Sequence, residues 1–168
     1  MSYRNKTYVI FDGRDIIQYR LMQAWKSNEN ISFNFYDVHP TREIYTDSEE
    51  TSVKRGLRER FSDTKQVVVL IGAGTRYKYQ YVKWEIELAQ EKGLPIIGVN
   101  LNGLRQLDED GCPAVMKNYH TIYVPFRPRI IQHALDNWPT QYYSIRNNSG
   151  IKNWSYPDAT YQSLGLIL

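Results

Sequence analysis

The sequence is poor in the residues that build disulfides and metal clusters. Cys112 is the only cysteine in 168 residues, which excludes an internal disulfide and a cluster of thiolate metal ligands. The three histidines, His39, His120 and His133, lie far apart and share no metal-ligand spacing. We therefore expect no metal site in this protein.

Charge of one sign and long apolar runs are also scarce. The formal net charge is +3, and the basic residues are scattered among acidic ones, so nucleic-acid binding is not expected. No segment approaches the length of a membrane span, and the apolar run in MSYRNKTYVIF is too short for a signal peptide. With 42% hydrophobic residues, the composition is typical of a single globular domain, which we expect in the cytoplasm.

Several motifs of phosphate binding and hydrolysis are missing as well. The absence of GKS and GKT excludes a P-loop, and the absence of G-x-S-x-G excludes a hydrolase nucleophile elbow. The stretch Gly72-Ala73-Gly74 is half of a dinucleotide fingerprint and is more typical of a plain turn. A receiver domain needs a phosphorylatable aspartate at the end of its third strand, and Ile71-Gly72 at that place argues against this class. A flavodoxin needs a phosphate-binding loop after its first strand, and the acidic FDGRD is unsuited to phosphate.

What the sequence does contain is a regular alternation of strand and helix patterns. Strands are predicted at 7–11, 31–38, 65–72, 94–101 and 119–126; helices are predicted at 14–26, 53–61, from Tyr81 onward and at 128–138. In the helix 14–26, one apolar side is expected to hold Ile17, Leu21, Ala24 and Trp25. The run VVVLI is typical of a central parallel strand covered on both faces.

This alternation predicts an α/β fold: a flavodoxin-like three-layer sandwich with a parallel five-stranded sheet. We expect the domain to span residues 1–138. Residues 139–168 are rich in aromatic residues and lack helical periodicity. They are predicted to form a C-terminal extension that packs on the domain or serves in assembly.

The helix that starts at Tyr81 carries two carboxylates with different expected surroundings. At about 100° per residue, Val82, Ile86 and Ala89 form one apolar stripe. Glu85 lies about 60° from Val82, at the edge of this stripe, and Glu87 lies about 140° away, among polar residues. Glu87 is therefore expected in solvent, whereas Glu85 either is a boundary residue with a polar partner or lines a cleft.

In a parallel sheet the ligand site lies outside the carboxyl ends of the strands. The segments at those ends are acidic and aromatic in this sequence, a composition that suits a flat base joined to a sugar. Each of these aromatic residues alone is more typical of core or surface packing. The residues concerned are Phe11, Asp12, Asp15, Tyr36, Asp37, Tyr77, Tyr79, Tyr81, Trp84 and Glu85.

Three of these segments, taken in order, resemble a known family. YVIFDGRD (8–15), FNFYDVHP (33–40) and YVKWEIELAQEKGLPIIGV (81–99) are similar to the two strand-to-loop segments and the helix motif of TIR-like domains. The resemblance covers roughly residues 5 to 125 and is closest to the branch that includes the TIR subunit of Thoeris antiphage systems. The catalytic glutamate of the family falls on Glu85, and Tyr81 takes a place that is usually tryptophan.

The resemblance implies an enzyme that consumes NAD and releases nicotinamide, with Glu85 as the catalytic residue. It further implies that activity requires a phage-derived trigger, that the protein self-assembles, and that a downstream effector reads the nucleotide product. NAD is the substrate, so no separate cofactor is expected. The residues implied in substrate binding are Phe11, Asp12, Asp15, Tyr36, Asp37, Tyr77, Tyr81 and Trp84.

Two alternatives stay open at this point. The product is a cyclic ADP-ribose isomer, linear ADP-ribose or a base-exchange product, and a cyclic isomer is the hypothesis we favour. The chain is either such an enzyme or a non-catalytic TIR-like module that binds partner proteins. The glutamate at position 85 favours the enzyme.

Overall fold

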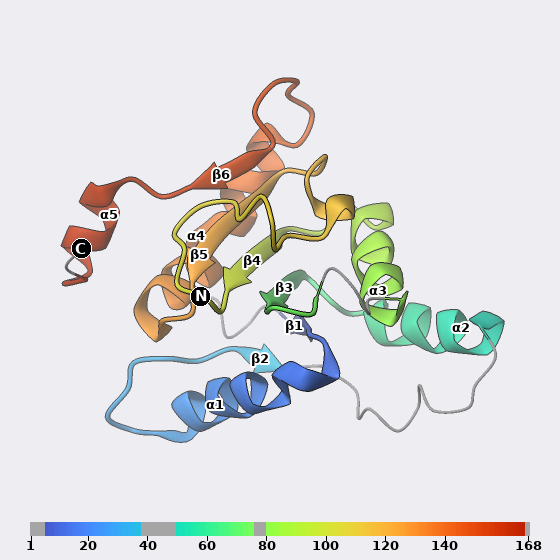
Figure 1. Ribbon diagram of the computed structural model, residues 1–168, viewed down its shortest axis with the longest axis horizontal. Coiled ribbons are helices and arrows are strands. Elements are labelled where there is room, and N and C mark those ends of the chain that lie inside the picture. Colours follow the sequence, from blue (N-terminus) through green and yellow to red (C-terminus); the bar gives the residue numbers. More distant parts are fainter. Residues whose placement is uncertain (1–5, 38–49, 76–79, 167–168) are drawn as a thin grey trace.

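A computed structural model describes residues 6–37, 50–75 and 80–166 of the chain. Strands and helices alternate along most of this length (Figure 1). In chain order the elements are β1 (Lys6–Ile10), the 3-10 turn η2 (Gly13–Asp15), α1 (Ile16–Ser27), β2 (Tyr36–Asp37), α2 (Glu50–Phe61), β3 (Gln66–Ile71), α3 (Gln80–Glu91), β4 (Ile96–Asn100), the 3-10 turn η4 (Ala114–Met116), β5 (Thr121–Pro125), α4 (Pro128–Ile145), β6 (Asn153–Ser155) and α5 (Asp158–Ser163).

The described strands form one parallel sheet in the order β2-β1-β3-β4-β5-β6. The prediction of a flavodoxin-like α/β fold with a parallel sheet is thus confirmed. Each of the five predicted strand segments contributes to the sheet, the second with only two residues. A sixth strand comes from the C-terminal extension and pairs with β5. The strand order reverses direction between β1 and β3, which makes the carboxyl ends of these two strands the topological switch point.

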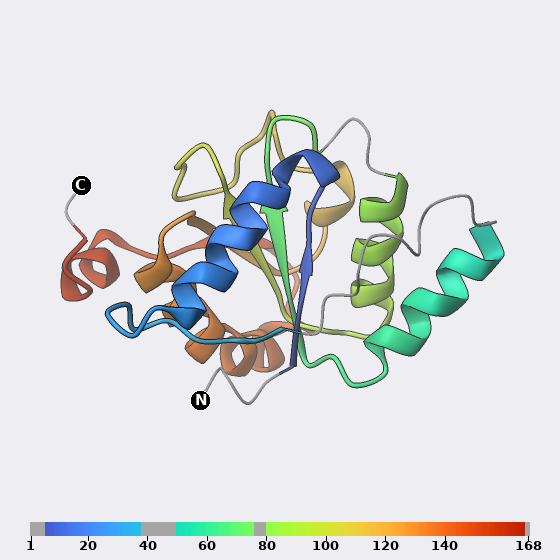
Figure 2. The ribbon, with the colours of Figure 1, turned by 90° about the horizontal axis from the view of Figure 1, so that it is seen from below.

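Helices cover both faces of the sheet because side chains alternate along each strand. Val9 of β1 packs in the cluster that contains α1 and α4, whereas Tyr8 packs in the cluster that contains α2 and α3. All residues of β3 are buried, as the continuous apolar run in its sequence predicts. Figure 2 shows α1 and α4 on one side of the sheet and α2 and α3 on the other.

The apolar side of α1 differs from the predicted one. Tyr19 and Met22 are the buried residues of α1, while Ile17 is 70% exposed and Leu21 is 43% exposed. The helix is rotated because the ring of Tyr19 stacks on Phe11, and its hydroxyl donates a hydrogen bond to Asp37. These contacts hold Tyr19 against the sheet and leave Ile17 and Leu21 in solvent.

The segment predicted as the second strand is mostly irregular. Only Tyr36 and Asp37 form a strand, although Phe33 and Phe35 are buried as the alternating pattern indicates. The backbone N–H of Asn34 donates to the side chain of Gln132 on α4 at 2.7 Å instead of joining the sheet. Burial of alternate side chains therefore does not require strand pairing here.

The last predicted helix is longer than expected. α4 continues past Trp138 through Pro139 to Ile145, so the predicted domain boundary at residue 138 falls inside a helix. A proline in a helix interior removes one backbone hydrogen bond, and sequence reasoning takes it as a helix end. Packing of Trp138 and Tyr142 in the core keeps the helix continuous on both sides of Pro139.

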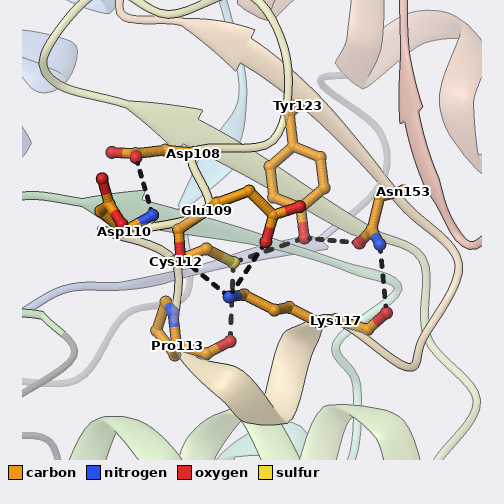
Figure 3. A network of polar contacts seen from close by, with 8 residues as sticks. All are labelled: Asp108, Glu109, Asp110, Cys112, Pro113, Lys117, Tyr123 and Asn153. Atoms are coloured by element: carbon orange, nitrogen blue, oxygen red, sulfur yellow. Dashed lines mark hydrogen bonds and ion pairs between the residues drawn. The ribbon is translucent and has the colours of Figure 1, made fainter.

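The C-terminal extension packs on the sheet through polar as well as apolar contacts. Tyr161 of α5 is buried in the same core cluster as α1 and α4. The Asn153 side chain accepts a hydrogen bond from Tyr123 on β5 and donates one to the carbonyl of Lys117 (Figure 3). The Trp154 indole donates to His120 at 3.0 Å. Residues 139–166 therefore complete one edge of the sheet.

Candidate active site at the switch point

Three segments lie at the edge of the sheet where β1 and β3 end, and the first two of them are in direct contact. They are residues 12–15, which follow β1, residues 72–75, which follow β3, and the first turns of α3. In Figure 2 the turn η2, the loop after β3 and the start of α3 lie at the same edge of the sheet. The predicted site residues Asp12, Asp15 and Glu85 belong to these segments.

Asp12 organises the segment after β1. Its carboxylate accepts a hydrogen bond from the backbone N–H of Arg14 at 2.9 Å and caps the turn η2. The same carboxylate pairs with the Arg14 guanidinium, with Nε to Oδ1 at 3.1 Å. Arg14 Nη2 also donates to the carbonyl of Gly74 at 3.2 Å. Arg14 therefore links the loop after β1 to the loop after β3.

The two glycines after β3 have a packing role in this link. A Cβ atom on Gly74 would lie 1.8 Å from Arg14 Nη2, and one on Gly72 would lie 2.4 Å from Asp15 Oδ2. Real Cβ contacts are never so short. A side chain at either glycine would therefore displace the Arg14 guanidinium or the Asp15 carboxylate, because these groups lie directly on the backbone of the second loop.

Asp15 is a partly buried carboxylate with one oxygen lacking a hydrogen bond. Among the residues that the structure describes, Asp15 Oδ2 is buried and has no donor. Burial raises the pKa of Asp15, the negative charge of Asp12 raises it further, and Arg14 and a hydrogen bond with Thr75 oppose the rise. Asp15 thus offers an unused acceptor at the edge of the sheet.

Glu85 lies on the buried side of α3. It is 1% exposed, and Val82 and Ile86 beside it belong to the core between α3 and the sheet. The predicted stripe of Val82, Ile86 and Ala89 is buried, and Glu87 is exposed, so the helical phase of this prediction is confirmed. In this conformation the Glu85 carboxylate is covered by protein.

The other predicted binding residues occupy two different surroundings. Phe11 is fully buried and stacks on Tyr19, whose hydroxyl donates to Asp37, so Phe11 and Asp37 lie on the α1 side of the sheet. Tyr81 and Trp84 meet edge to face at 5.4 Å on α3. The side chain of Tyr36 and the whole of Tyr77 and Tyr79 lie outside the described residues.

Trp84 faces α2 rather than the edge of the sheet. It lines a pocket of about 140 Å³ between α2 and α3, together with Leu57, Arg58, Glu87, Leu88 and Glu91. Arg58 and Glu91 form a salt bridge at the wall of this pocket, with 3.0 Å between Nη2 and Oε2. The structure therefore separates Trp84 from the carboxylates at the end of β1, and its binding role stays a prediction.

The family model described as "Thoeris protein ThsB, TIR-like domain" matches residues 2–106, more than half of the chain. The chain belongs to this family. The matched residues include every predicted site residue and end in the loop after β4, so β5, α4, β6 and α5 lie beyond the match. A comparison with curated proteins gives no match.

Three residues that shape this edge of the sheet were not among the site residues predicted from the sequence of this Thoeris TIR-like domain. Arg14 links two loops, Thr75 accepts a hydrogen bond from the backbone of Gly72 at 2.8 Å, and Tyr19 joins Phe11 to Asp37. A threonine directly after Gly-Ala-Gly is the one available signal for the second of these contacts. Nothing in the pattern of the first helix marks Tyr19, because Ile17 and Leu21 are the more apolar choices.

Among the described residues, no helix is both long and apolar enough to cross a membrane. No group of three or more histidine, cysteine, aspartate or glutamate side chains among them has the geometry to hold a metal ion.

Proposed function

We propose that this chain is an NAD-consuming enzyme of antiphage defence that acts in the cytoplasm and releases nicotinamide. The observation that carries the proposal is the almost complete burial of the Glu85 carboxylate on an otherwise apolar face of α3. A buried carboxylate needs polar partners and costs stability that an apolar residue at the same position would not, so its presence on this face calls for a role in the chemistry. Membership of the Thoeris TIR-like family supports the functional explanation.

The proposed chemistry needs few catalytic groups. The nicotinamide nitrogen of NAD is positively charged before the glycosidic bond breaks, so nicotinamide leaves as a neutral molecule. Ordinary glycosidases need a second carboxyl group to protonate the leaving oxygen, whereas this reaction does not. Glu85 would hold the ribose hydroxyls and stabilise the positive charge that develops at the anomeric carbon. Asp12 and Asp15 would line the mouth of the pocket.

The covered position of Glu85 also supports the need for a trigger. NAD reaches Glu85 only after neighbouring residues move, because 99% of its surface is out of contact with water. We therefore propose that binding of a phage-derived component, with self-assembly of the chain, opens the site. The nucleotide product is then read by a downstream effector.

A single pair of substitutions tests this proposal. Glu85→Gln should lower nicotinamide release by about a hundredfold or more, since it removes the charge that stabilises the transition state. Glu87→Gln is the matched control, because Glu87 is on the same helix but exposed. Purified variants are incubated with NAD, with and without extract of infected cells, and products are identified by mass. Full activity of Glu85→Gln, or loss of activity in Glu87→Gln, would refute the assignment.

The product of the reaction is a cyclic ADP-ribose isomer in this proposal. Aromatic residues Tyr36, Tyr77 and Tyr81 would hold one folded NAD molecule and place an adenosine-side group near the anomeric carbon. Phe11 is fully buried against Tyr19, so it would take part only after the site opens. Such proximity lowers the barrier by about 7 kcal/mol or more in favourable cases. In oxygen-18 water a cyclic product carries no label at the anomeric carbon. Labelled linear ADP-ribose from the first time point would exclude the cyclase.

One observation favours a second function, that of a non-catalytic interaction module. Ile17 and Leu21 lie one turn apart on α1 and are exposed, so they supply two apolar side chains to a contact surface on this helix. The two functions differ in their dependence on Glu85. Cells that carry the Glu85→Gln chain should lose phage resistance if the protein is an enzyme and keep it if the chain only binds partners.

A further inference from the structure

The loop after β4 holds an arginine against the C-terminal extension. The guanidinium of Arg105 lies 3.9 Å from the ring centre of Tyr161, which is 1% exposed. Tyr156 is the neighbouring tyrosine of the extension and interacts electrostatically with Tyr161. We call these three residues, Arg105, Tyr156 and Tyr161, the Arg105 cluster.

The polar atoms of the Arg105 cluster have no acceptor. Arg105 Nη1, Tyr156 OH and Tyr161 OH are each buried, and no described residue accepts a hydrogen bond from them. Buried polar groups are satisfied in the great majority of cases, so three unpaired donors in one cluster require an explanation. Arg105 Nη1 only donates, and each tyrosine hydroxyl donates as well as accepts, so an acceptor-rich group would receive a hydrogen bond from all three.

The charge of Arg105 faces the ring of Tyr161 rather than an anion. Within the described part of the chain, no carboxylate lies within salt-bridge distance of its guanidinium. Asp158 of α5 interacts electrostatically with Tyr161 but forms no ion pair with Arg105. A partly buried arginine without an anion is unfavourable, and phosphate-type oxyanions match the planar fork of its N–H groups.

The backbone on both sides of the cluster is fixed. The side chain of Asn100 donates to the carbonyls of Leu104 and Gln106, at 3.0 and 2.8 Å, and so holds the residues that flank Arg105. On the other side, Arg129 donates to the carbonyl of Leu164 at 2.8 Å and anchors the end of α5. The backbone segments that carry Arg105 and Tyr161 are therefore held in place before any ligand binds.

We infer that the Arg105 cluster is a binding site for a phosphate-type oxyanion, held by Arg105 Nη1 and the hydroxyls of Tyr156 and Tyr161. The site lies between the loop after β4 and α5. The three donor atoms are covered by protein, so the partly exposed side chain of Arg105 must move to admit the anion. Burial raises the pKa of Tyr161 to about 12, and it also raises the pKa of Tyr156. Both hydroxyls therefore stay protonated, as donors to an anion must.

The experiment measures the unfolding midpoint of the full chain while inorganic phosphate replaces chloride at constant ionic strength. The unfolding midpoint should rise with phosphate concentration, and the rise should follow the concentration dependence expected for one binding site. ADP-ribose and acetate form two further series, which distinguish a phosphate ester and a carboxylate from free phosphate. The inference requires that phosphate or the phosphate ester raises the unfolding midpoint at a lower concentration than acetate does.

Variants locate the site. Arg105→Gln should weaken the phosphate response by at least about tenfold, since it removes a charged hydrogen-bond donor. Arg20→Gln, an exposed position on α1 with the same change of charge, is the matched control and should respond like the wild type. The double variant Tyr156→Phe/Tyr161→Phe should also lose the response, while its midpoint without phosphate stays equal or rises, because it removes two unpaired donors.

Three results would overturn the inference. They are a wild-type midpoint that does not change with phosphate or ADP-ribose, an Arg105→Gln variant that responds like the wild type, and a crystal grown in phosphate that shows only water at the three donors. None of these results depends on Glu85, so the inference and the proposed enzyme activity fail or hold separately.

Discussion

The loops after β1 and β4 each present an arginine, but the two arginines have opposite surroundings. Arg14 is exposed, pairs with Asp12 and donates to a backbone carbonyl of the neighbouring loop. Arg105 is partly buried, lacks a carboxylate among the described residues and stacks on the ring of Tyr161. Each arginine thus contacts a second segment of the chain, but among the described residues only Arg14 of the two pairs with a carboxylate.

The buried atoms that lack a hydrogen bond also differ between the two regions. Beside Arg14 the buried atom without a hydrogen bond is an acceptor, Asp15 Oδ2, whereas in the Arg105 cluster Arg105 Nη1 is a donor and the two tyrosine hydroxyls each have a proton to donate. An unpaired acceptor suits a ligand with hydroxyl groups, such as a ribose, and unpaired donors suit an oxyanion. The comparison therefore assigns the two regions to ligands of opposite hydrogen-bonding character.

The largest expected effect on stability comes from the close contact between the first loop and the loop after β3. Gly72→Ala places a Cβ atom 2.4 Å from Asp15 Oδ2, so either the carboxylate or the backbone must move. Overpacking of this kind costs about 1–3 kcal/mol of unfolding free energy. Urea denaturation of wild type and variant measures the difference.

The control for this substitution is another glycine of the same region. A Cβ on Gly13 meets no atom within 4 Å, so Gly13→Ala should leave the unfolding free energy nearly unchanged. Equal losses for Gly72→Ala and Gly13→Ala would show that the two loops are not held together by the contacts described above.

The second effect separates the two roles of Asp12. Asp12→Ala removes both the cap of η2 and the partner of Arg14, and should cost about 1 kcal/mol. Asp12→Asn keeps an acceptor for the backbone N–H of Arg14 but removes the charge, and should cost only a few tenths, because pairs with an exposed partner contribute little. Urea denaturation of both variants tests this order, and an equal loss in the two would assign the effect to the ion pair.

The fold was predictable from sequence because its strongest signals are local. The buried run of β3 and the alternation of strands with helices determine a parallel sheet, and the structure has that sheet. The phase of α3 was also predictable, because Val82, Ile86 and Ala89 are apolar and Glu87 is not. These features depend on residues close together in the sequence.

The features that sequence reasoning missed depend on contacts between distant residues. The rotation of α1 follows from the contacts of Tyr19 with Phe11 and Asp37, which no helical period contains. The passage of α4 through Pro139 follows from the core contacts of Trp138 and Tyr142. The link from Arg14 to Gly74 joins two loops that are 60 residues apart. For Glu85, the sequence predicted a boundary position, and its almost complete burial required the structure.

The smallest expected effect is a pH dependence that tests the surroundings of Asp15. Its pKa is raised above the ordinary value of 3.8, mainly by burial and then by the charge of Asp12. Between 3.8 and the raised pKa, the folded state binds more protons than the unfolded state at this residue. The contribution of Asp15 to the unfolding free energy must therefore fall as pH rises through this window and stay constant above it. Asp15→Asn removes the contribution at every pH.

The surface pair of Lys6 and Asp63 provides a control of opposite sign. Lys6 lowers the pKa of Asp63 through a hydrogen bond and its charge, so the contribution of Asp63 is present above 3.8 and is lost as pH falls through the lowered pKa. Urea denaturation across the acid range gives the difference in unfolding free energy between wild type and each Asn variant. This difference should fall with rising pH for Asp15→Asn and rise with pH for Asp63→Asn. The same sign in both variants would mean that Asp15 is not held as the unpaired acceptor that distinguishes the loop after β1 from the loop after β4.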